Sequence, residues 1–305
     1  MKIGCSIAGQ FYGILVYADD IFLLCPSREG LQAMVAECEI FAKETGLSFS
    51  TNPVVEKSKT KCIIFSKKNL DDTKVPKIVL NGLPLLWAPS ILHLGNTVEC
   101  DNSFKKDICI KRGKFIGKIN TLSQEFFFTT PEVKITLFEK YCLSFYNSNL
   151  WNLFSKEVDR LYKSWNVTVR IAHEVPRNTH CYFIEPLSQC LHIKKLLCAR
   201  FVKFHQTLID CLKPSVRVLA HISKNDSSTV HGSNLLNISK LCETPIENMN
   251  SIIVKQNMQV YSCPTGEEWR IPVVIELCQV RNEDLTIDNF EKAELKEYIE
   301  YLCTT

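Results

Sequence analysis

The chain has 305 residues, 46% of them hydrophobic and 23% charged, and this balance excludes a disordered, collagen-like or coiled-coil protein. The net charge is only +3, and no apolar run reaches the length of a membrane span, so the composition implies neither a nucleic-acid nor a membrane partner. Residues 126–220 carry a net charge of +6 and residues 221–305 one of −6. Contact with a polyanion is therefore expected before about residue 220.

Fifteen cysteines are scattered through the chain, and no two of them have Cys-x-x-Cys spacing. A zinc ribbon or a thioredoxin-type motif is therefore absent from the sequence, and reduced thiols in an intracellular protein of the cytoplasm or nucleus are expected. The alternative is a secreted protein, because residues 1–18 resemble a signal peptide with a small-residue cleavage site. Gln10 and three glycines dilute the apolar part of this segment, and we expect a protein that is not secreted.

The first 65 residues predict an antiparallel sheet with one helix packed on its face. The segment 29–45 has apolar residues at helical spacing, Ser27 suits the helix start and Gly46 is a typical helix stop. Tyr17 to Asp20 lie between the first two of four β-prone runs, so these two runs predict a hairpin. The four runs cover residues 11–16, 21–25, 47–51 and 61–65.

The rest of the chain changes from short strands to helices. Strands are predicted at 77–80 and 91–98, around the turn signal Asn81-Gly82. After about Asn102 the pattern is helical, and Thr130-Pro131 is a typical helix start. Further helices are expected at 153–173, 186–212 and 284–303, and an exposed polar loop at 223–233.

The fold class expected from these patterns is α+β, with three regions. Residues 1–100 would form a small sheet domain and residues 101–220 a helical region. Residues 221–305 would form a polar loop and an acidic helical segment.

The pair Asp19-Asp20 at the tip of the first predicted hairpin carries the clearest chemical signal. Hard cations prefer oxygen ligands, and Mg²⁺ is usually held by one or two carboxylates together with substrate phosphates. Nucleotide polymerases use two such ions to activate the attacking hydroxyl and to stabilise the leaving group. The alternative is an ordinary solvated turn, in which aspartates are common.

The surrounding sequence resembles the reverse transcriptase of non-long-terminal-repeat retrotransposons, of the jockey-like kind. Phe11 to Ser27, with Tyr-Ala-Asp-Asp at its centre, is similar to the family's third conserved block. Residues 41–65 resemble the fourth block, and residues 91–98 the fifth, called the primer grip. Weaker similarity follows in the helical region at Trp165-Asn166, 175–180 and 199–204, so that the resemblance covers about residues 3–275.

The resemblance implies a role for several residues, a partial polymerase palm and a helical thumb-like region. Asp19 and Asp20 would be catalytic carboxylates that bind Mg²⁺, and Tyr17 would lie under the primer terminus. Lys59 would lie near the triphosphate, where a cation stabilises developing negative charge. An ordinary solvated lysine is the alternative for Lys59.

Two further segments are expected to contact nucleic acid. The resemblance implies that Leu94 and Gly95 form a tight turn that holds the primer backbone, the alternative being a simple hairpin turn. The segment 105–118 is strongly basic and has an apolar helical face, so it could follow the backbone of a template–primer duplex through salt-dependent contacts. The alternative is a solvated helix face. The basic residues expected to make this contact are Lys105, Lys111, Arg112 and Lys114.

The departure from the family pattern decides the expected function. The family's reaction needs a further Asp on an earlier strand, and this chain has no acidic residue before Asp19. We therefore expect the C-terminal part of an RNA-directed DNA polymerase that is inactive alone. Its partners would be an RNA template, a DNA primer and, if complete, a dNTP. A palm without its first strands would leave a hydrophobic edge of its sheet unpaired, and such an edge is an aggregation hazard. The alternative is a non-catalytic nucleic-acid-binding protein left over from a retroelement.

A metal site in the helical region is a further alternative. Five potential ligands lie close together in the sequence, but their spacing is not that of a zinc finger or knuckle, so core positions are expected for them. They are Cys190, His192, Cys198, His205 and Cys211.

Overall fold

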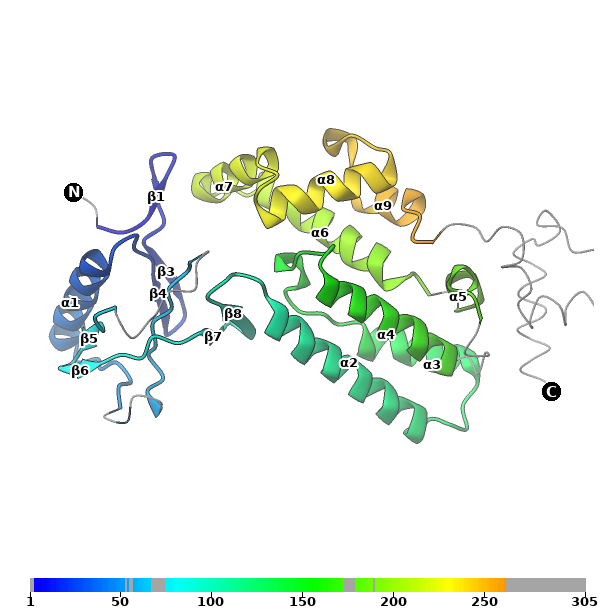
Figure 1. The fold of residues 1–305 in the computed structure, drawn as a ribbon, viewed down its shortest axis with the longest axis horizontal. Helices are drawn as coiled ribbons and strands as arrows, with labels where there is room; N and C mark the ends of the chain where they lie inside the picture. Colours follow the sequence, from blue (N-terminus) through cyan, green and yellow to red (C-terminus); the bar gives the residue numbers. More distant parts are fainter. Residues whose placement is uncertain are drawn as a thin grey trace, which may run out of the picture. The chain divides into compact units, whose positions relative to one another are not determined.

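The structure, a computed structural model, describes residues 3–52, 54, 57–66, 75–172, 179–188 and 190–261. The chain divides into two compact units. Unit 1 comprises Met1–Lys106 and Leu208–Ile222, and unit 2 comprises Asp107–Thr207 and Ser223–Thr305. Figure 1 colours both along the sequence. The fold mixes helices with small antiparallel sheets, in agreement with the α+β expectation at this coarse level.

The sheet structure of unit 1 consists, within the described residues, of separate two-stranded antiparallel ladders. The turns Asn81-Gly82 and Leu94-Gly95 have positive φ at both residues, which suits the right-handed twist of the strands they join. The strands pair in chain order as β1 (Ser6–Ile7) with β2 (Gln10–Phe11), β3 (Ile14–Tyr17) with β4 (Asp20–Leu23), β5 (Val79–Leu80) with β6 (Leu83–Pro84), and β7 (Ser90–His93) with β8 (Asn96–Glu99).

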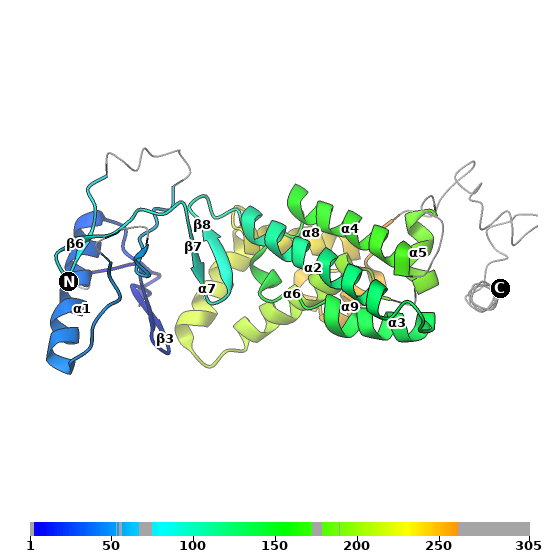
Figure 2. The same ribbon diagram turned by 90° about the horizontal axis from the view of Figure 1, so that it is seen from below.

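Helix α1 (Arg28–Thr45) begins and ends as the sequence predicts. The Ser27 hydroxyl accepts a hydrogen bond from the Gly30 amide at 3.1 Å, which caps the start of the helix. Gly46 ends it with φ 69°, in the left-handed conformation that glycine adopts readily. Figure 2 shows α1 and the β7–β8 hairpin of unit 1. The core beneath the helix contains Val35, Ile78, Leu80, Leu85 and Trp87.

The prediction of one sheet over residues 11–65 is wrong within the described residues. Residues 47–51 and 61–65 form no strand; Cys62 makes a single parallel bridge to Trp87. A β-prone run forms a ladder only where another strand is placed to form hydrogen bonds with several of its residues. Residues 61–65 pair in this way at Cys62 alone.

The helices follow residue 104, as predicted, and most belong to unit 2. The helix start at Thr130-Pro131 is confirmed, with Thr130 at the N-cap and Pro131 in the first turn. The helices are α2 (Lys105–Glu125), α3 (Pro131–Leu137), α4 (Lys156–Ala172), α5 (Cys181–Ser188), α6 (Ile193–Ile209), α7 (Pro214–Asn225), α8 (Val230–Cys242) and α9 (Ser251–Asn257). A π-helical turn covers Phe138–Cys142, and short 3-10 turns cover Ser148–Leu150 and Ile246–Asn248.

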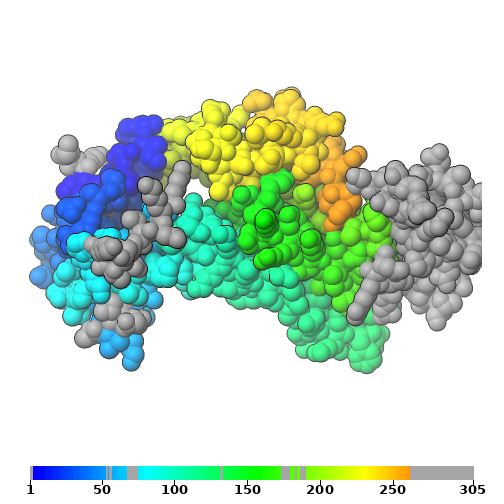
Figure 3. All heavy atoms as spheres, in the orientation of Figure 1, coloured from blue at the N-terminus to red at the C-terminus, as the bar shows by residue number. Residues whose placement is uncertain are grey.

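The core of unit 2 is built around large side chains that are fully buried, among them Trp151, Leu161, Trp165 and Phe201. Asn234 of α8 is also fully buried and clamps the segment before α4. Its Oδ1 accepts from the Leu153 amide at 3.1 Å, and its Nδ2 donates to the Trp151 carbonyl at 2.8 Å. In Figure 3, α8 and α9 (yellow to orange) lie next to the green residues of this region.

Two predicted helical boundaries need correction. The helix expected over 186–212 is divided into α5 and α6. The new helix starts after His192, whose Nδ1 accepts a hydrogen bond from the Lys194 amide at 3.1 Å and so caps α6. The loop expected over 223–233 is confined to residues 226–229, since α7 continues to Asn225 and α8 begins at Val230. The helix predicted at 284–303 lies outside the described residues. Within the part of the chain that the structure describes, no helix combines the length and apolar character needed to cross a membrane.

Candidate functional site

Asp19 and Asp20 lie at the tip of the β3–β4 hairpin. Tyr17 faces Asp20 in the register, so Ala18 and Asp19 form the two-residue turn. Ala18 has φ 52°, in the left-handed region that alanine rarely adopts. Both carboxylates are exposed. The predicted hairpin and its tip are therefore present.

The hairpin is not packed on both faces by the described residues. The side chains of Val16 and Tyr17 are 64% and 66% exposed, and those of Ile14, Leu15 and Ile21 are also exposed. An unpaired apolar sheet edge is expected here from the sequence, and β3 and β4 pair only with one another among the described strands. The exposed side chains of this hairpin are therefore mostly apolar up to its tip.

A hollow of about 780 Å³ in unit 1 brings the sequence-predicted catalytic residues together. Asp19, Asp20 and Lys59 are all among the residues that line it. The volume is in the range of pockets that hold a small ligand. These three predicted site residues line the same hollow. Two of them are negatively charged and one is positively charged.

Three further residues of this hollow were not singled out from the sequence. Lys57 and Lys61 line it together with Lys59, and three lysines within five residues are the signal that could have indicated a shared basic lining. His93 of β7 also lines it and stacks on Phe22 of β4, with ring centroids 5.0 Å apart and an interplanar angle of 26°. This stack joins the β7–β8 hairpin to the β3–β4 hairpin.

The donor set fits a magnesium ion only in part. Two adjacent carboxylates suit an ion that keeps several waters and takes its other ligands from substrate phosphates. Within the described residues, no cluster of three or more His, Cys, Asp or Glu side chains is arranged to hold a metal ion. The protein groups present at the hairpin tip therefore suit one phosphate-assisted ion and do not complete a two-metal site.

The residues predicted to hold the primer lie elsewhere on unit 1. Tyr17 is exposed at the end of β3, and Leu94 and Gly95 form the exposed turn between β7 and β8. Leu94 has φ 45° and Gly95 φ 76°, so this turn is tight. None of the three is among the residues that line the hollow.

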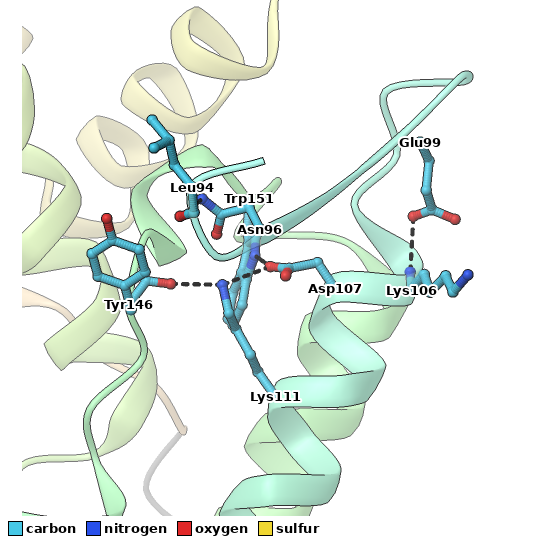
Figure 4. A network of polar contacts seen from close by, with 8 residues as sticks. All are labelled: Leu94, Asn96, Glu99, Lys106, Asp107, Lys111, Tyr146 and Trp151. Carbon is cyan, nitrogen blue, oxygen red and sulfur yellow. Dashed lines mark hydrogen bonds and ion pairs between the residues drawn. The ribbon is translucent and has the colours of Figure 1, made fainter. Parts of the chain in front are cut away.

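The basic segment of α2 separates into exposed and internally bonded residues. Lys111 Nζ contacts Asp107 Oδ2 at 2.9 Å and donates to the Tyr146 carbonyl at 2.7 Å (Figure 4). Arg112 Nε donates to the Ser164 hydroxyl at 2.7 Å. Lys114 is exposed. Lys111 and Arg112 thus hold α2 within unit 2, whereas Lys114 leaves its charge in solvent.

Lys105 lies at the start of α2, in unit 1. Its ammonium group is 3.7 Å from Asp101, and both side chains are more than half exposed. The Asp101 pKa is lowered, chiefly by a hydrogen bond from Ser103 and also by Lys105. Such an exposed pair contributes little to stability.

Four of the five potential ligands lie in the core of unit 2, as expected: Cys190, His192, Cys198 and His205 are buried. Cys211 belongs to unit 1 and is only partly buried, so the core position expected for it is not found. Burial raises the pKa of Cys198 to about 12 and lowers that of His192 to about 3. The thiol therefore stays protonated and the imidazole neutral at physiological pH. His205 Nδ1 lies 2.9 Å from His231 Nε2 and links α6 to α8.

Comparisons of the chain with protein-family models, with curated protein sequences and with solved structures found no match. The functional argument therefore depends on the residues and their geometry.

Proposed function

We propose that the chain is the palm and thumb-like part of an RNA-directed DNA polymerase of a non-LTR retrotransposon, unable to catalyse synthesis alone. The observation that carries the proposal is the hollow in unit 1, whose lining includes Asp19, Asp20 and Lys59. Carboxylates for a cation and lysines for phosphates are the two halves of a nucleoside triphosphate site.

The roles of the residues follow from their charge and place. Asp19 and Asp20 would hold Mg²⁺, which when bound would neutralise phosphate charge and polarise the phosphoryl group being transferred. Lys59, together with Lys57 and Lys61 of the same hollow, would attract and orient the triphosphate. Asp19 and Asp20 by themselves suit one such ion and do not complete a two-metal site. Binding without synthesis is the expected property of the chain.

The first experiment uses Mn²⁺ as a probe for Mg²⁺ and measures its binding to the chain by electron paramagnetic resonance in the presence of dATP. The full chain is expected to bind the Mn²⁺–dATP complex saturably. The variants Asp19→Ala and Asp20→Ala should lose at least ten-fold in affinity, whereas Asp101→Ala, which removes an exposed carboxylate outside the hollow, should leave it unchanged. Equal binding by all four proteins would contradict the proposal.

The second experiment is primer extension on an RNA template with a DNA primer, dNTPs and Mg²⁺. The wild-type chain should give no product above the Asp19→Ala control. Robust extension by the wild type that is lost in Asp19→Ala would show that the chain is a complete catalyst and would refute the expected inactivity.

A second candidate function is nucleic-acid binding without any nucleotide site. The observation that favours it is the exposed surface of α2, where Lys114 is free of acidic neighbours from residue 108 to residue 124. This candidate predicts binding to an RNA–DNA duplex that falls steeply with salt, together with no binding of Mn²⁺–dATP.

A further inference from the structure

The last turn of α4 and the start of α5 meet in a polar cluster within unit 2. Arg170, near the end of α4, donates from Nη2 to the Sγ of Cys181, the first residue of α5, at 3.2 Å. Its Nε and Nη2 also donate to the Thr179 carbonyl, at 3.0 and 2.6 Å. The backbone that precedes α5 therefore holds the guanidinium group beside the sulfur.

Asn166 of α4 places an amide group against the same sulfur. Its Nδ2 lies 3.6 Å from Cys181 Sγ and also donates to the Tyr261 hydroxyl. Asn166 is only 5% exposed, yet its Oδ1 has no hydrogen-bond partner among the described residues. Both atoms belong to one planar amide, so this unpartnered acceptor lies close to the sulfur.

The Thr179 hydroxyl is a second oxygen of the cluster without a partner among the described residues. Thr179 is 1% exposed, and its carbonyl is the one that accepts from Arg170. Buried polar atoms are normally hydrogen-bonded. Two unsatisfied oxygens on residues that contact Arg170 or Cys181 therefore indicate that the cluster suits one more hydroxyl group.

Cys181 is also accessible enough to react. It is partly exposed, whereas Cys190 and Cys198 of the same unit are almost fully buried. It begins a helix, where backbone N–H groups without intrahelical partners give a positive partial charge. A helix start, a neighbouring arginine and partial exposure are together typical of reactive cysteines.

We propose that Cys181 is a modification site, which hydrogen peroxide oxidises reversibly to a sulfenic acid. The sulfur loses its proton to solvent and attacks one peroxide oxygen, so that an S–O bond forms as the O–O bond breaks. The sulfur is oxidised by two electrons, and the other oxygen leaves as hydroxide, which takes up a proton and becomes water.

The cluster provides for both products of this step. Arg170 would stabilise the negative charge on the leaving oxygen, because a guanidinium group forms strong hydrogen bonds to anions. The new S–OH group would donate to Asn166 Oδ1, which supplies the partner that this oxygen lacks. The inference does not rest on the proposed function, because the hollow that contains Asp19 and Asp20 belongs to unit 1.

The experiment treats the reduced full chain with hydrogen peroxide, traps sulfenic acid with dimedone and identifies each labelled cysteine by mass spectrometry. Cys109 of α2 is the internal control, because it is exposed. Labelling of Cys181 should be about ten-fold faster than labelling of Cys109, although Cys181 is the less exposed thiol. Equal or faster labelling of Cys109 would show that exposure alone sets the rate and would overturn the proposal.

The variant Arg170→Gln tests the role of the guanidinium group. It should slow the labelling of Cys181 about ten-fold and leave that of Cys109 unchanged. The matched control is Lys163→Gln, which removes an exposed positive charge from α4 outside the cluster and should label like the wild type. An unchanged rate at Cys181 in Arg170→Gln would contradict the proposal.

The buried Cys198 reports whether the variant is still folded, because it should stay unlabelled while unit 2 is intact. If Arg170→Gln exposes Cys198, the ratio of Cys181 to Cys109 labelling in the wild type decides alone. Reversibility has its own measurement: dithiothreitol added before dimedone should abolish the label at Cys181 and restore the free thiol. Oxidation of Cys181 that dithiothreitol does not reverse would contradict a reversible site.

Discussion

Nε1 of Trp151 donates a hydrogen bond to Oδ2 of Asp107 at 2.8 Å and so joins α2 to the segment that precedes α4. Both residues are almost fully buried. The same carboxylate oxygen contacts Lys111 Nζ at 2.9 Å, and that ammonium group lies 5.5 Å from the centroid of the Trp151 ring. A buried charged carboxylate is tolerated only when it is paired and hydrogen-bonded. For Asp107, Lys111 supplies the opposite charge and Trp151 the hydrogen bond.

Replacement of Asp107 by Ala is therefore expected to destabilise the protein strongly. The variant leaves the Lys111 ammonium group, which is only 14% exposed, without its counter-charge. Breaking a buried pair in this way typically costs about 3–5 kcal/mol. Urea unfolding measures the effect, and Asp101→Ala, which breaks an exposed pair, should cost less than about 1 kcal/mol. Equal stability of both variants would contradict the role assigned to Asp107.

Gly113 and Gly117 lie inside α2, where a β-carbon would meet nothing within 4 Å. Because glycine in a helix interior costs about 1 kcal/mol relative to alanine, Gly113→Ala and Gly117→Ala should each raise the stability by up to that amount. Thermal unfolding monitored by circular dichroism tests this. The matched control is Gly232→Ala in α8, whose β-carbon would lie 2.3 Å from the Asp226 carbonyl oxygen, and which should destabilise the protein.

Lys114 and Lys111 should respond differently in nucleic-acid binding. Removal of the exposed Lys114 charge should lower the salt dependence of binding by about one unit of the log–log slope, without loss of stability. Lys111→Ala should lower the stability, because its partners are inside the protein. Fluorescence anisotropy on an RNA–DNA duplex at several salt concentrations measures the first effect, and urea unfolding the second. If the salt-dependence slope of Lys114→Ala equals that of the wild type, Lys114 of α2 does not contact the nucleic acid.

His192 should make the stability depend on pH. Burial, helped by Lys194 and Lys195, lowers its pKa from 6.5 to about 3. The unfolded chain therefore binds a proton below pH 6.5 that the folded chain does not bind until about pH 3. The contribution of the neutral, buried His192 to the free energy of unfolding is fully present above pH 6.5. It is lost, at about 1.4 kcal/mol per pH unit, as the pH falls towards 3.

The measurement is urea unfolding between pH 8 and pH 4. His192→Phe keeps a ring against Trp165 and should flatten the slope below pH 6.5, whereas Tyr261→Phe leaves the buried imidazole in place and should keep it. A slope that is unchanged in His192→Phe would show that the proton is taken up elsewhere.

Local signals in the sequence were sufficient for the elements that depend on near neighbours. The β3–β4 hairpin and α1 follow from a short polar segment between two apolar runs and from Ser27 and Gly46 at the helix ends. The strand expected at 61–65 failed because pairing requires an edge from a distant part of the chain. The loop expected at 223–233 was too long because the role of Thr229, whose hydroxyl accepts from the Gly232 amide and caps α8, was missed.

The candidate site was predictable to the same extent. Asp19, Asp20 and Lys59 were identified from the sequence, and the structure places all three around one hollow. His93 was not, since its stacking on Phe22 joins residues that are distant in sequence. The i,i+4 spacing of Asp107 and Lys111 was the signal that separates Lys111 from Lys114, whereas the contact of Lys111 with the Tyr146 carbonyl joins residues that are distant in sequence.

Unit 1 is discontinuous in sequence, and this has a consequence for biosynthesis. Its N-terminal part is complete at residue 106, but the segment Leu208–Ile222 is made only after more than a hundred further residues. The Tyr12 hydroxyl, between β2 and β3, donates to the Ser215 carbonyl at 2.7 Å, so this contact cannot form until a late part of the chain has been made. During translation, the hairpins that carry Asp19 and Asp20 therefore leave the ribosome well before their unit can close.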